Sequence, residues 1–183
     1  MLGDTVRGLI SSTRHMGHVF AGHCRRFRRY LHGSWPGADP CRHSSSHAIY
    51  VHYDAEGVVH DYVLEQLRQL SIAGFRVTFV SNARKFRDAS VAAVKPFCRQ
   101  IIRRRNVGYD FGAYKDAIAL LGDLAECDRL LLMNDSVYGP FRPLTSIFEM
   151  ADPECDFWGI TDSWHQHHVG PWIIGNIEIP IDA

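Results

Sequence analysis

His47-Ala-Ile-Tyr-Val-His-Tyr53 is a run of β-branched and aromatic residues that stops at Asp54 and Gly57. Such a run, bounded by turn residues, predicts a β-strand followed by a loop. In residues 58–73 the apolar side chains recur at helical spacing. Phe75-Arg-Val-Thr-Phe-Val80 then predicts a second strand by the same criterion as the first. This part of the chain therefore indicates a strand–helix–strand unit.

The same alternation of strand and helix continues along the chain. The further elements that we expect are helices at 89–97, 111–121 and 144–150 and strands at 100–103, 130–133 and 156–161. Each connection is long enough for a crossover, so the strands are expected to lie parallel. The strand at 130–133 is uniformly apolar, which is typical of a strand buried on both faces. The predicted fold class is α/β, with an open, mostly parallel sheet and helices on both faces.

Length and composition exclude several classes of protein. A chain of 183 residues with 46% hydrophobic residues fits one domain and is too apolar for general disorder. It has no run of 18 apolar residues that would span a bilayer. Its five cysteines form no C-x-x-C pair, so we expect reduced thiols and no zinc site.

Residues 1–46 differ from the rest, because they carry seven arginines against two aspartates. We predict a basic, weakly ordered arm, in which residues 19–31 have the spacing of a short helix. Two interpretations stay open: a disordered extension, or an anchor on an anionic membrane surface. No apolar stretch of the kind found in secretory signals follows the first charges. The expected location is the cytoplasm, with peripheral contact at the inner face of the cytoplasmic membrane under the second interpretation.

Polar residues follow four of the predicted strands, at the edge where open α/β sheets bind ligands. The clusters are His52-Tyr-Asp54, Ser81-Asn82, Arg105-Asn-Val-Gly-Tyr-Asp-Phe-Gly112 and Asn134-Asp-Ser-Val-Tyr-Gly-Pro140. Any one of them is explained by ordinary turn chemistry. Four clusters at successive strand ends predict a polar, partly acidic cleft.

Two of the clusters indicate particular chemistry. Asp110 stands at the start of a predicted helix, where capping of the free amides is its simplest role. The preceding run, Arg103–Arg105, suits either phosphate binding or a solvated face. Asp135 leaves an apolar strand beside Asn134 and Ser136, and oxygen donors in that arrangement suit Mg²⁺ or Mn²⁺ bound together with substrate phosphates. The alternative is that Asp135 only hydrogen-bonds the turn that follows it.

Common nucleotide and hydrolase signatures are absent from the sequence. It contains no G-x-x-x-x-G-K-[ST], no G-x-G-x-x-G and no G-x-S-x-G. These absences disfavour phosphate-loop hydrolases, dinucleotide oxidoreductases and serine hydrolases.

Five blocks of the chain, taken in order, resemble one known family. They are His52-Tyr-Asp54, Val80-Ser-Asn82, Arg105-Asn-Val-Gly-Tyr-Asp-Phe-Gly-Ala-Tyr-Lys115, Leu132-Met-Asn-Asp-Ser-Val-Tyr-Gly-Pro140 and Asp156-Phe-Trp-Gly-Ile-Thr161. Over about residues 47–165 the chain resembles the rhamnan-synthesis protein F family. Members of that family resemble glycosyltransferases of the GT-A fold and build rhamnose-containing cell-surface polysaccharides. The resemblance implies a GT-A-like domain that binds a nucleotide sugar and serves a polysaccharide or lipid-linked glycan acceptor.

The resemblance also implies roles for the residues in the matching blocks. Those expected around the base, ribose and nucleoside are His52, Tyr53, Asp54 and Asn82. Those expected around the diphosphate and sugar are Asn106, Gly108, Tyr109, Asp110, Asn134 and Ser136. Asp135 would hold a metal ion, because Asn134-Asp-Ser136 stands where GT-A enzymes commonly carry an Asp-x-Asp motif, here with one carboxylate.

The implied reaction is attack by an acceptor hydroxyl on the anomeric carbon, which displaces a nucleoside diphosphate. An inverting enzyme needs a carboxylate within hydrogen-bond reach of that hydroxyl. We rank Asp162 first for this role and Asp156 second, because Asp156 at a strand start has a structural explanation.

The last part of the chain departs from the pattern. After His165-Gln-His-His168 the final fifteen residues do not resemble the family, and we expect a divergent tail over 166–183 that reflects truncation or a shifted reading frame. The alternative function is therefore a non-catalytic remnant or partner subunit that retains the nucleotide-sugar-binding fold. Nucleic acid is not expected as a partner, since the basic charges lie outside the predicted domain.

Overall fold

The computed structural model describes residues 30–122, 124, 126–152 and 154–159. Its elements are β1 (Leu31–Pro36), β2 (Ser46–His52), α2 (Asp61–Ile72), β3 (Arg76–Ser81), α3 (Asp88–Val94), η1 (Lys95–Phe97), β4 (Cys98–Arg104), α4 (Tyr109–Leu121), β5 (Arg129–Asn134) and α5 (Leu144–Glu149). The chain divides into two compact units, the first ending at Phe141 and the second beginning at Arg142.

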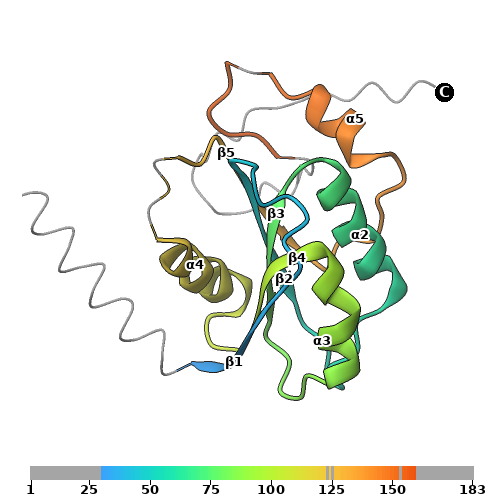
Figure 1. Ribbon diagram of the computed structural model, residues 1–183, viewed down its shortest axis with the longest axis vertical. Helices are drawn as coiled ribbons and strands as arrows, with labels where there is room; N and C mark the ends of the chain where they lie inside the picture. Colours follow the sequence, from blue (N-terminus) through green and yellow to red (C-terminus); the bar gives the residue numbers. More distant parts are fainter. Residues whose placement is uncertain (1–29, 123, 125, 153, 160–183) are drawn as a thin grey trace, which may run out of the picture. The chain divides into compact units, whose positions relative to one another are not determined.

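The first unit is built on a five-stranded sheet of order β1-β4-β3-β2-β5 (Figure 1). The pairings β4–β3, β3–β2 and β2–β5 are parallel, and β1 runs antiparallel to β4 at one edge. In the register of the central strands, Ile49 of β2 lies between Thr78 of β3 and Leu132 of β5. The predicted α/β class and mostly parallel sheet are confirmed, and the antiparallel edge strand is a feature that the sequence did not predict.

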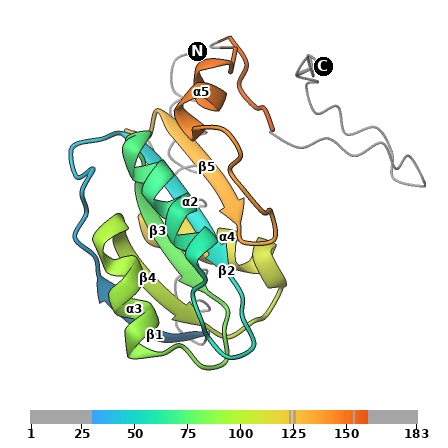
Figure 2. The same ribbon diagram turned by 90° about the vertical axis from the view of Figure 1, so that its right-hand side faces the viewer.

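Helices cover both faces of this sheet, with α4 on one side and α2 and α3 on the other (Figures 1 and 2). On the α4 side, β-branched residues of the strands pack against two small helix residues, in a core of Ile49, Val51, Val80, Ile102, Ala113 and Ala117. The alanines let the helix axis approach the sheet closely. On the other side Tyr50 and Phe79 stack at 5.7 Å between ring centroids. Each large side chain buried in this way contributes about 1.5–3 kcal/mol.

Helix α2 shows why its segment folds as predicted. Its buried residues are Val63, Gln66, Leu67 and Leu70, which recur at the spacing of one helix face. The chain leaves the helix through Gly74, whose φ of 81° belongs to the left-handed region that favours glycine. The helices predicted at 58–73, 89–97, 111–121 and 144–150 are all present with shifted ends.

Strand β5 is less buried than the sequence predicted. Leu130 and Leu132 are 36% and 45% exposed. The expectation of burial on both faces is wrong, because β5 lies at an edge of the sheet and pairs only with β2 among the described strands. A uniformly apolar strand therefore need not be a central one.

Strand β1 lies within the segment that the sequence assigned to the N-terminal arm. Its residues alternate between half-buried and exposed, as expected of an edge strand, and Pro36 at its end needs no ladder hydrogen bond there. The sheet therefore begins before residue 47. The division into arm, domain and tail stays a prediction, and the helix expected over residues 19–31 lies outside the described residues apart from its last two. Leu31 belongs to β1.

The second unit comprises residues 142–183; its described part, up to residue 159, contains α5. Phe148 of α5 and Trp158 meet edge to face at 6.0 Å between centroids. Residues 156–159 form a bend and irregular backbone, so the strand predicted at 156–161 is wrong over that part. In the described part of the chain no helix combines the length and the apolar character that crossing a bilayer requires.

Candidate functional site

The order of the strands marks one position on the sheet edge. From β2 the chain steps outward to β3 and β4, and after α4 it returns across the sheet to place β5 on the other side of β2. The direction of winding thus reverses between β2 and β5. In open α/β sheets ligands bind beyond the carboxyl ends of the strands at such a reversal. His52 and Asn134 end the two strands that meet there.

Asp135 joins the ends of these two strands. Its backbone amide donates to the carbonyl of Val51 at 3.0 Å, and its Oδ2 accepts from the amide of Tyr53 at 2.9 Å. Its carbonyl accepts from the hydroxyl of Tyr62 at 3.1 Å, which adds helix α2 to the junction. Asp135 is therefore positioned by the backbone of β2 and by one helix.

His52 lies beside this carboxylate, with 3.9 Å between its Nε2 and Oδ2 of Asp135. Burial raises the pKa of Asp135, and the Tyr53 amide and His52 oppose that rise. Burial lowers the pKa of His52, with Asp135 opposing. Burial thus favours the uncharged form of each side chain, and each side chain in its charged form stabilises the charge on the other.

The imidazole of His52 is buried and its ring nitrogens have partners. Nε2 lies 3.0 Å from the carbonyl of Val58 and Nδ1 lies 3.2 Å from the hydroxyl of Ser81. The ring also packs against Phe79 and Phe86, at 5.4 and 6.0 Å between centroids. In this structure His52 holds the β2 loop in place, and its expected closeness to the base and ribose stays a prediction.

The loop after β2 is organised by Asp54. Its Oδ1 accepts hydrogen bonds from the amides of Glu56 and Val58 at 2.9 and 2.8 Å. The Val58 amide is the main cause that lowers the pKa of Asp54. This is the turn chemistry that the sequence left open for this cluster, and it leaves Tyr53 53% exposed at the edge.

Asn82, at the end of β3, is buried and bonded on every side. Its backbone amide donates to the backbone carbonyl of His52 at 2.8 Å, and its side-chain Nδ2 donates to the backbone carbonyl of Tyr109 at 3.3 Å. Its Oδ1 accepts from Nη1 of Arg104 at 2.8 Å. Asn82 therefore connects the ends of β2 and β4 with the start of α4.

Arg104 is a buried residue beneath this edge whose hydrogen bonds the sequence reasoning did not predict. Only 1% of it is exposed, and its Nε and Nη2 lie 3.0 and 2.8 Å from Oδ2 of Asp116. Nη2 also donates to the carbonyl of Val107 at 2.8 Å. The buried guanidinium group thus holds the loop before α4 in place through its hydrogen bond to the Val107 carbonyl. Of the two uses considered for Arg103–Arg105, phosphate binding and a solvated face, neither applies to Arg104.

The start of α4 depends on two glycines. Gly108 has φ of 74°, and a Cβ on Gly112 would lie 2.2 Å from the carbonyl oxygen of Val107. No side chain caps this end of the helix, so capping by Asp110 is not observed. The Oδ2 of Asp110 instead accepts from Nδ2 of Asn134 at 2.7 Å. No side chain therefore accepts from the first amides of α4, and helix amino termini favour anions.

Asn134 extends this contact to the fourth cluster. Its Oδ1 accepts from the hydroxyl of Ser136 at 2.9 Å while its Nδ2 holds Asp110. These two hydrogen bonds connect the Asp110 carboxylate on α4 through Asn134 to Ser136 in the loop after β5. Another buried amide, Gln66 of α2, donates to the carbonyls of Val137 and Gly139 at 2.7 and 2.9 Å and fixes that loop. The sequence signal that could have identified Gln66 is its position as a polar residue on the otherwise apolar face of α2.

The carboxylates at this edge are too few to hold a divalent cation by themselves. Among the residues that the structure describes, no three His, Cys, Asp or Glu side chains are grouped to hold a metal ion. Asp135 is the carboxylate at the strand junction, and Asp110 is near enough to raise its pKa. Mg²⁺ commonly takes one or two protein carboxylates, with phosphate oxygens and water as its other ligands. The site fits a divalent ion only in that partial way.

The structure brings most of the predicted site residues to one edge. Those found there are His52, Tyr53, Asp54, Asn82, Asn106, Gly108, Tyr109, Asp110, Asn134, Asp135 and Ser136. Asn106 and Tyr109 are exposed, the latter by 76%. Asp156 is exposed in the second unit, and Asp162 lies outside the described residues. The roles expected for all of them stay predictions.

A protein-family model described as rhamnan synthesis protein F matches residues 77–173, just over half of the chain. The match begins later than the resemblance predicted over 47–165 and extends further. The statement that the last fifteen residues are unlike the family is therefore wrong for 169–173.

Two curated proteins are similar to parts of the chain. The uncharacterized protein y4gN of Sinorhizobium fredii is 38% identical over 100 residues, which are 54% of this chain and 26% of that protein. The virulence protein VirA of Vibrio anguillarum is 36% identical over 86 residues, which are 44% of this chain and 27% of that protein. The chain thus spans about a quarter of the length of the curated relatives it matches. No solved structure gives a significant match.

Proposed function

Since the chain belongs to the rhamnan synthesis protein F family, we propose that the carboxyl edge of its sheet binds the nucleoside-diphosphate sugar of a polysaccharide glycosyltransferase. The sugar would be passed to a growing cell-surface polysaccharide, with rhamnose as the sugar that the family description suggests. In this proposal the sheet and its helices are the nucleotide-sugar-binding half of a GT-A-like fold.

The observation that carries the proposal is the convergence of four strand ends at the reversal point. Backbone and side-chain contacts connect β2 through β3 and α4 to β5. The Asn82 backbone bonds the His52 carbonyl and its side chain bonds the Tyr109 carbonyl, Asp110 accepts from Asn134, and Asp135 lies beside His52. Loops that merely close turns have no reason to share such a network. A ligand that spans from a nucleoside to a sugar needs groups from several strands held in fixed positions.

The chemistry of this edge suits a diphosphate. The uncapped amino terminus of α4 offers backbone amides and the positive end of the helix dipole. Asn106 and Tyr109 are exposed beside it, and Tyr53 offers an exposed aromatic ring on the β2 side. We assign the diphosphate to the α4 end of the edge and the nucleoside to the β2 end.

Asp135 is the residue that would hold Mg²⁺ or Mn²⁺ in this proposal. A divalent ion bound there together with the diphosphate supplies electrostatic stabilisation of the charge on the leaving group. Asp135 has a pKa raised by burial, which a cation opposes by favouring the carboxylate. General-base action by Asp162, or by Asp156 in second place, completes the proposed transfer.

The test is thermal unfolding with uridine, guanosine and deoxythymidine diphosphates, in the presence of Mn²⁺. A ligand that binds only the folded chain raises its melting temperature, by the equivalent of about 2.7 kcal/mol at a hundred times its dissociation constant. We expect one of the three to do so, and Asp135→Asn to remove the contribution of Mn²⁺. Asp88→Asn, an exposed carboxylate of α3, is the matched control.

Two results would distinguish a glycosyltransferase from a chain that binds the sugar donor without transferring it, and from a chain that does not bind the donor. A nucleotide shift with no sugar transfer to any acceptor would favour the non-catalytic alternative, in which the chain binds the donor only. No shift with any of the three nucleotides would contradict donor binding itself.

A further inference from the structure

Basic side chains gather at the carboxyl ends of β3 and β4, beside the candidate site. The loop after β3 carries Arg84, Lys85 and Arg87, all three exposed. At the end of β4, Arg105 is exposed and Arg103 is half-buried. The ion pairs found within the described part of the chain include none of these residues. We call the five residues together the basic surface.

Two contacts hold the loop after β3 against the rest of the sheet. Nη2 of Arg103 donates to the backbone carbonyl of Arg84, which joins the loop to the end of β4. Phe86, in the middle of the loop, is buried and stacks on Phe79 at 6.0 Å between ring centroids. Because Phe86 is anchored in the core, the basic residues on either side of it are held at the surface.

Exposed carboxylates in the adjoining segments do not balance this charge. Asp88 begins α3 directly after the loop, and Glu56 belongs to the loop after β2. The two loops are in contact, since a Cβ on Gly57 would lie 1.8 Å from the carbonyl oxygen of Lys85. Five positive charges against these two negative ones leave the surface positive.

The arginine-rich arm joins the sheet at the same place. The carbonyl of Tyr30, the residue before β1, accepts a hydrogen bond from the amide of Arg105 at 2.7 Å. Residues 25–29 contain four arginines and no acidic residue. A chain spans at most about 3.6 Å per residue, so all four arginines are within about 18 Å of Tyr30. The covalent connection therefore keeps the charges of the arm close to the basic surface.

Exposed apolar side chains follow the basic residues directly. Val107, Tyr109 and Phe111 are 39%, 76% and 86% exposed, in the loop before α4 and in its first turn. The amide of Val107 donates to the carbonyl of Arg105 at 2.8 Å, which keeps this loop beside the basic surface. Basic residues together with exposed aromatic ones are typical of protein surfaces that lie on a bilayer.

We propose that the basic surface, the arginines of residues 25–29 and Phe111 together bind an anionic lipid bilayer. The basic side chains attract the charged headgroups, and the phenylalanine ring enters the apolar boundary beneath them. This interaction does not need the proposed sugar donor. It would set the carboxyl edge of the sheet against the membrane, because Arg84 lies two residues beyond Asn82. A lipid-linked glycan acceptor would then meet the candidate site at the bilayer.

The test is co-sedimentation of the full chain with vesicles of phosphatidylcholine and phosphatidylglycerol. Each basic residue near an anionic surface contributes about 1 kcal/mol, so Arg84→Gln/Arg87→Gln should bind about thirtyfold more weakly. Arg28→Gln/Arg29→Gln should be weakened to a similar extent. Vesicles of phosphatidylcholine alone should bind the unaltered chain weakly, and equal binding to both kinds of vesicle would overturn the proposal.

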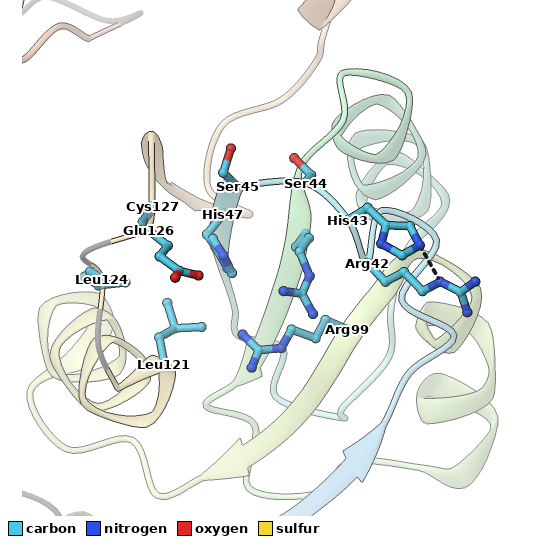
Figure 3. A pocket seen from close by; sticks show the side chains of 11 residues that line it. Arg42, His43, Ser44, Ser45, His47, Arg99, Leu121, Leu124, Glu126 and Cys127 are labelled. Atoms are coloured by element: carbon cyan, nitrogen blue, oxygen red, sulfur yellow. Dashed lines mark hydrogen bonds between the residues drawn. The ribbon is translucent and has the colours of Figure 1, made fainter.

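Arg42→Gln/Arg68→Gln is the matched control, because it removes the same charge from other parts of the surface. Figure 3 shows Arg42 at the opposite edge of the sheet, in the loop before β2. Arg68 is exposed on α2 and pairs with Glu65 at 2.6 Å. The control should bind vesicles as tightly as the unaltered chain. If Arg84→Gln/Arg87→Gln binds as tightly as the control, the proposal is overturned.

Phe111→Ser distinguishes a bilayer from nucleic acid as the anionic partner. We expect this variant to bind vesicles several-fold more weakly, also at high salt, because salt screens the charges and not the burial of an apolar ring. If Phe111→Ser binds vesicles like the unaltered chain, while Arg84→Gln/Arg87→Gln weakens binding to duplex DNA, the partner is nucleic acid and the proposal is overturned. The nucleotide shift in melting temperature is measured without vesicles, so its outcome is independent of this one.

Discussion

Replacing Asp116 by asparagine tests whether the buried pair with Arg104 supports the candidate site. Arg104 is 1% and Asp116 6% exposed, and their side chains approach to 2.8 Å. Asparagine keeps the shape of the side chain but leaves the guanidinium charge buried without a counter-charge. Breaking a buried pair in this way costs about 3–5 kcal/mol of the free energy of unfolding. We expect a loss of that size in Asp116→Asn.

A double-mutant cycle separates the pair from its surroundings. Arg104→Met alone removes the donors to Asn82 and to the Val107 carbonyl and leaves Asp116 uncompensated. The double variant Arg104→Met/Asp116→Asn is expected to cost less than the two single changes added together, because no unpaired charge remains. Both Arg104 variants should also weaken nucleoside-diphosphate binding, since the loop before α4 loses its support.

The assay is urea unfolding followed by circular dichroism, with nucleotide affinity measured by calorimetry on the same samples. Glu65→Gln is the control, because Glu65 pairs with Arg68 on the surface and its loss should change stability little. If Asp116→Asn is no more destabilising than Glu65→Gln, or if the single costs simply add, the interpretation of Arg104 as a buried support is refuted.

Three further predictions concern single residues. Gly112→Ala should lower the melting temperature, although alanine usually favours a helix, because its Cβ would meet the Val107 carbonyl oxygen at 2.2 Å; an unchanged melting temperature would contradict this. The pKa of Asp54 is lower in the folded chain than in the unfolded chain, so ionised Asp54 stabilises the fold at pH values above its ordinary pKa of 3.8. This stabilisation should be lost as the pH falls through the lowered pKa. Over that pH interval the stability of Asp54→Asn should change less with pH than the stability of the unchanged protein. Identical acid-unfolding curves for the two would contradict this prediction. Burial raises the pKa of Cys98, whereas Cys155 is exposed, so Cys155→Ser and not Cys98→Ser should reduce thiol labelling of the native chain.

The parts of the fold that the sequence predicted are those set by local pattern. The β-branched run of β2 and the apolar face of α2 need no knowledge of distant partners. The exposure of Leu132 was not predictable in the same way, because its burial depends on whether another strand lies beyond β5. Strand β1 was missed because Gly33 and Pro36 weaken the local signal and pairing with β4 determines the strand.

In the candidate site, too, the sequence predicted some features and missed those that depend on residues distant along the chain. Polar residues after strands, together with a parallel sheet, were enough to predict that Asn82 and Asp135 share an edge. The sequence did not show which of three consecutive arginines is buried, because that depends on Asp116 in the packed helix α4. It also favoured capping for Asp110, whose partner is Asn134 on a strand distant in sequence.

The most direct measurement of the central claim is NMR mapping of a nucleoside diphosphate on the full chain. The account predicts that the amide signals of Tyr109, Gly112 and Asp135 shift with a common dissociation constant. Those of His47 and Arg99, at the opposite edge, should not share that constant. Shifts confined to the opposite edge, or spread over the surface without saturation, would contradict a donor site at the carboxyl ends of the strands.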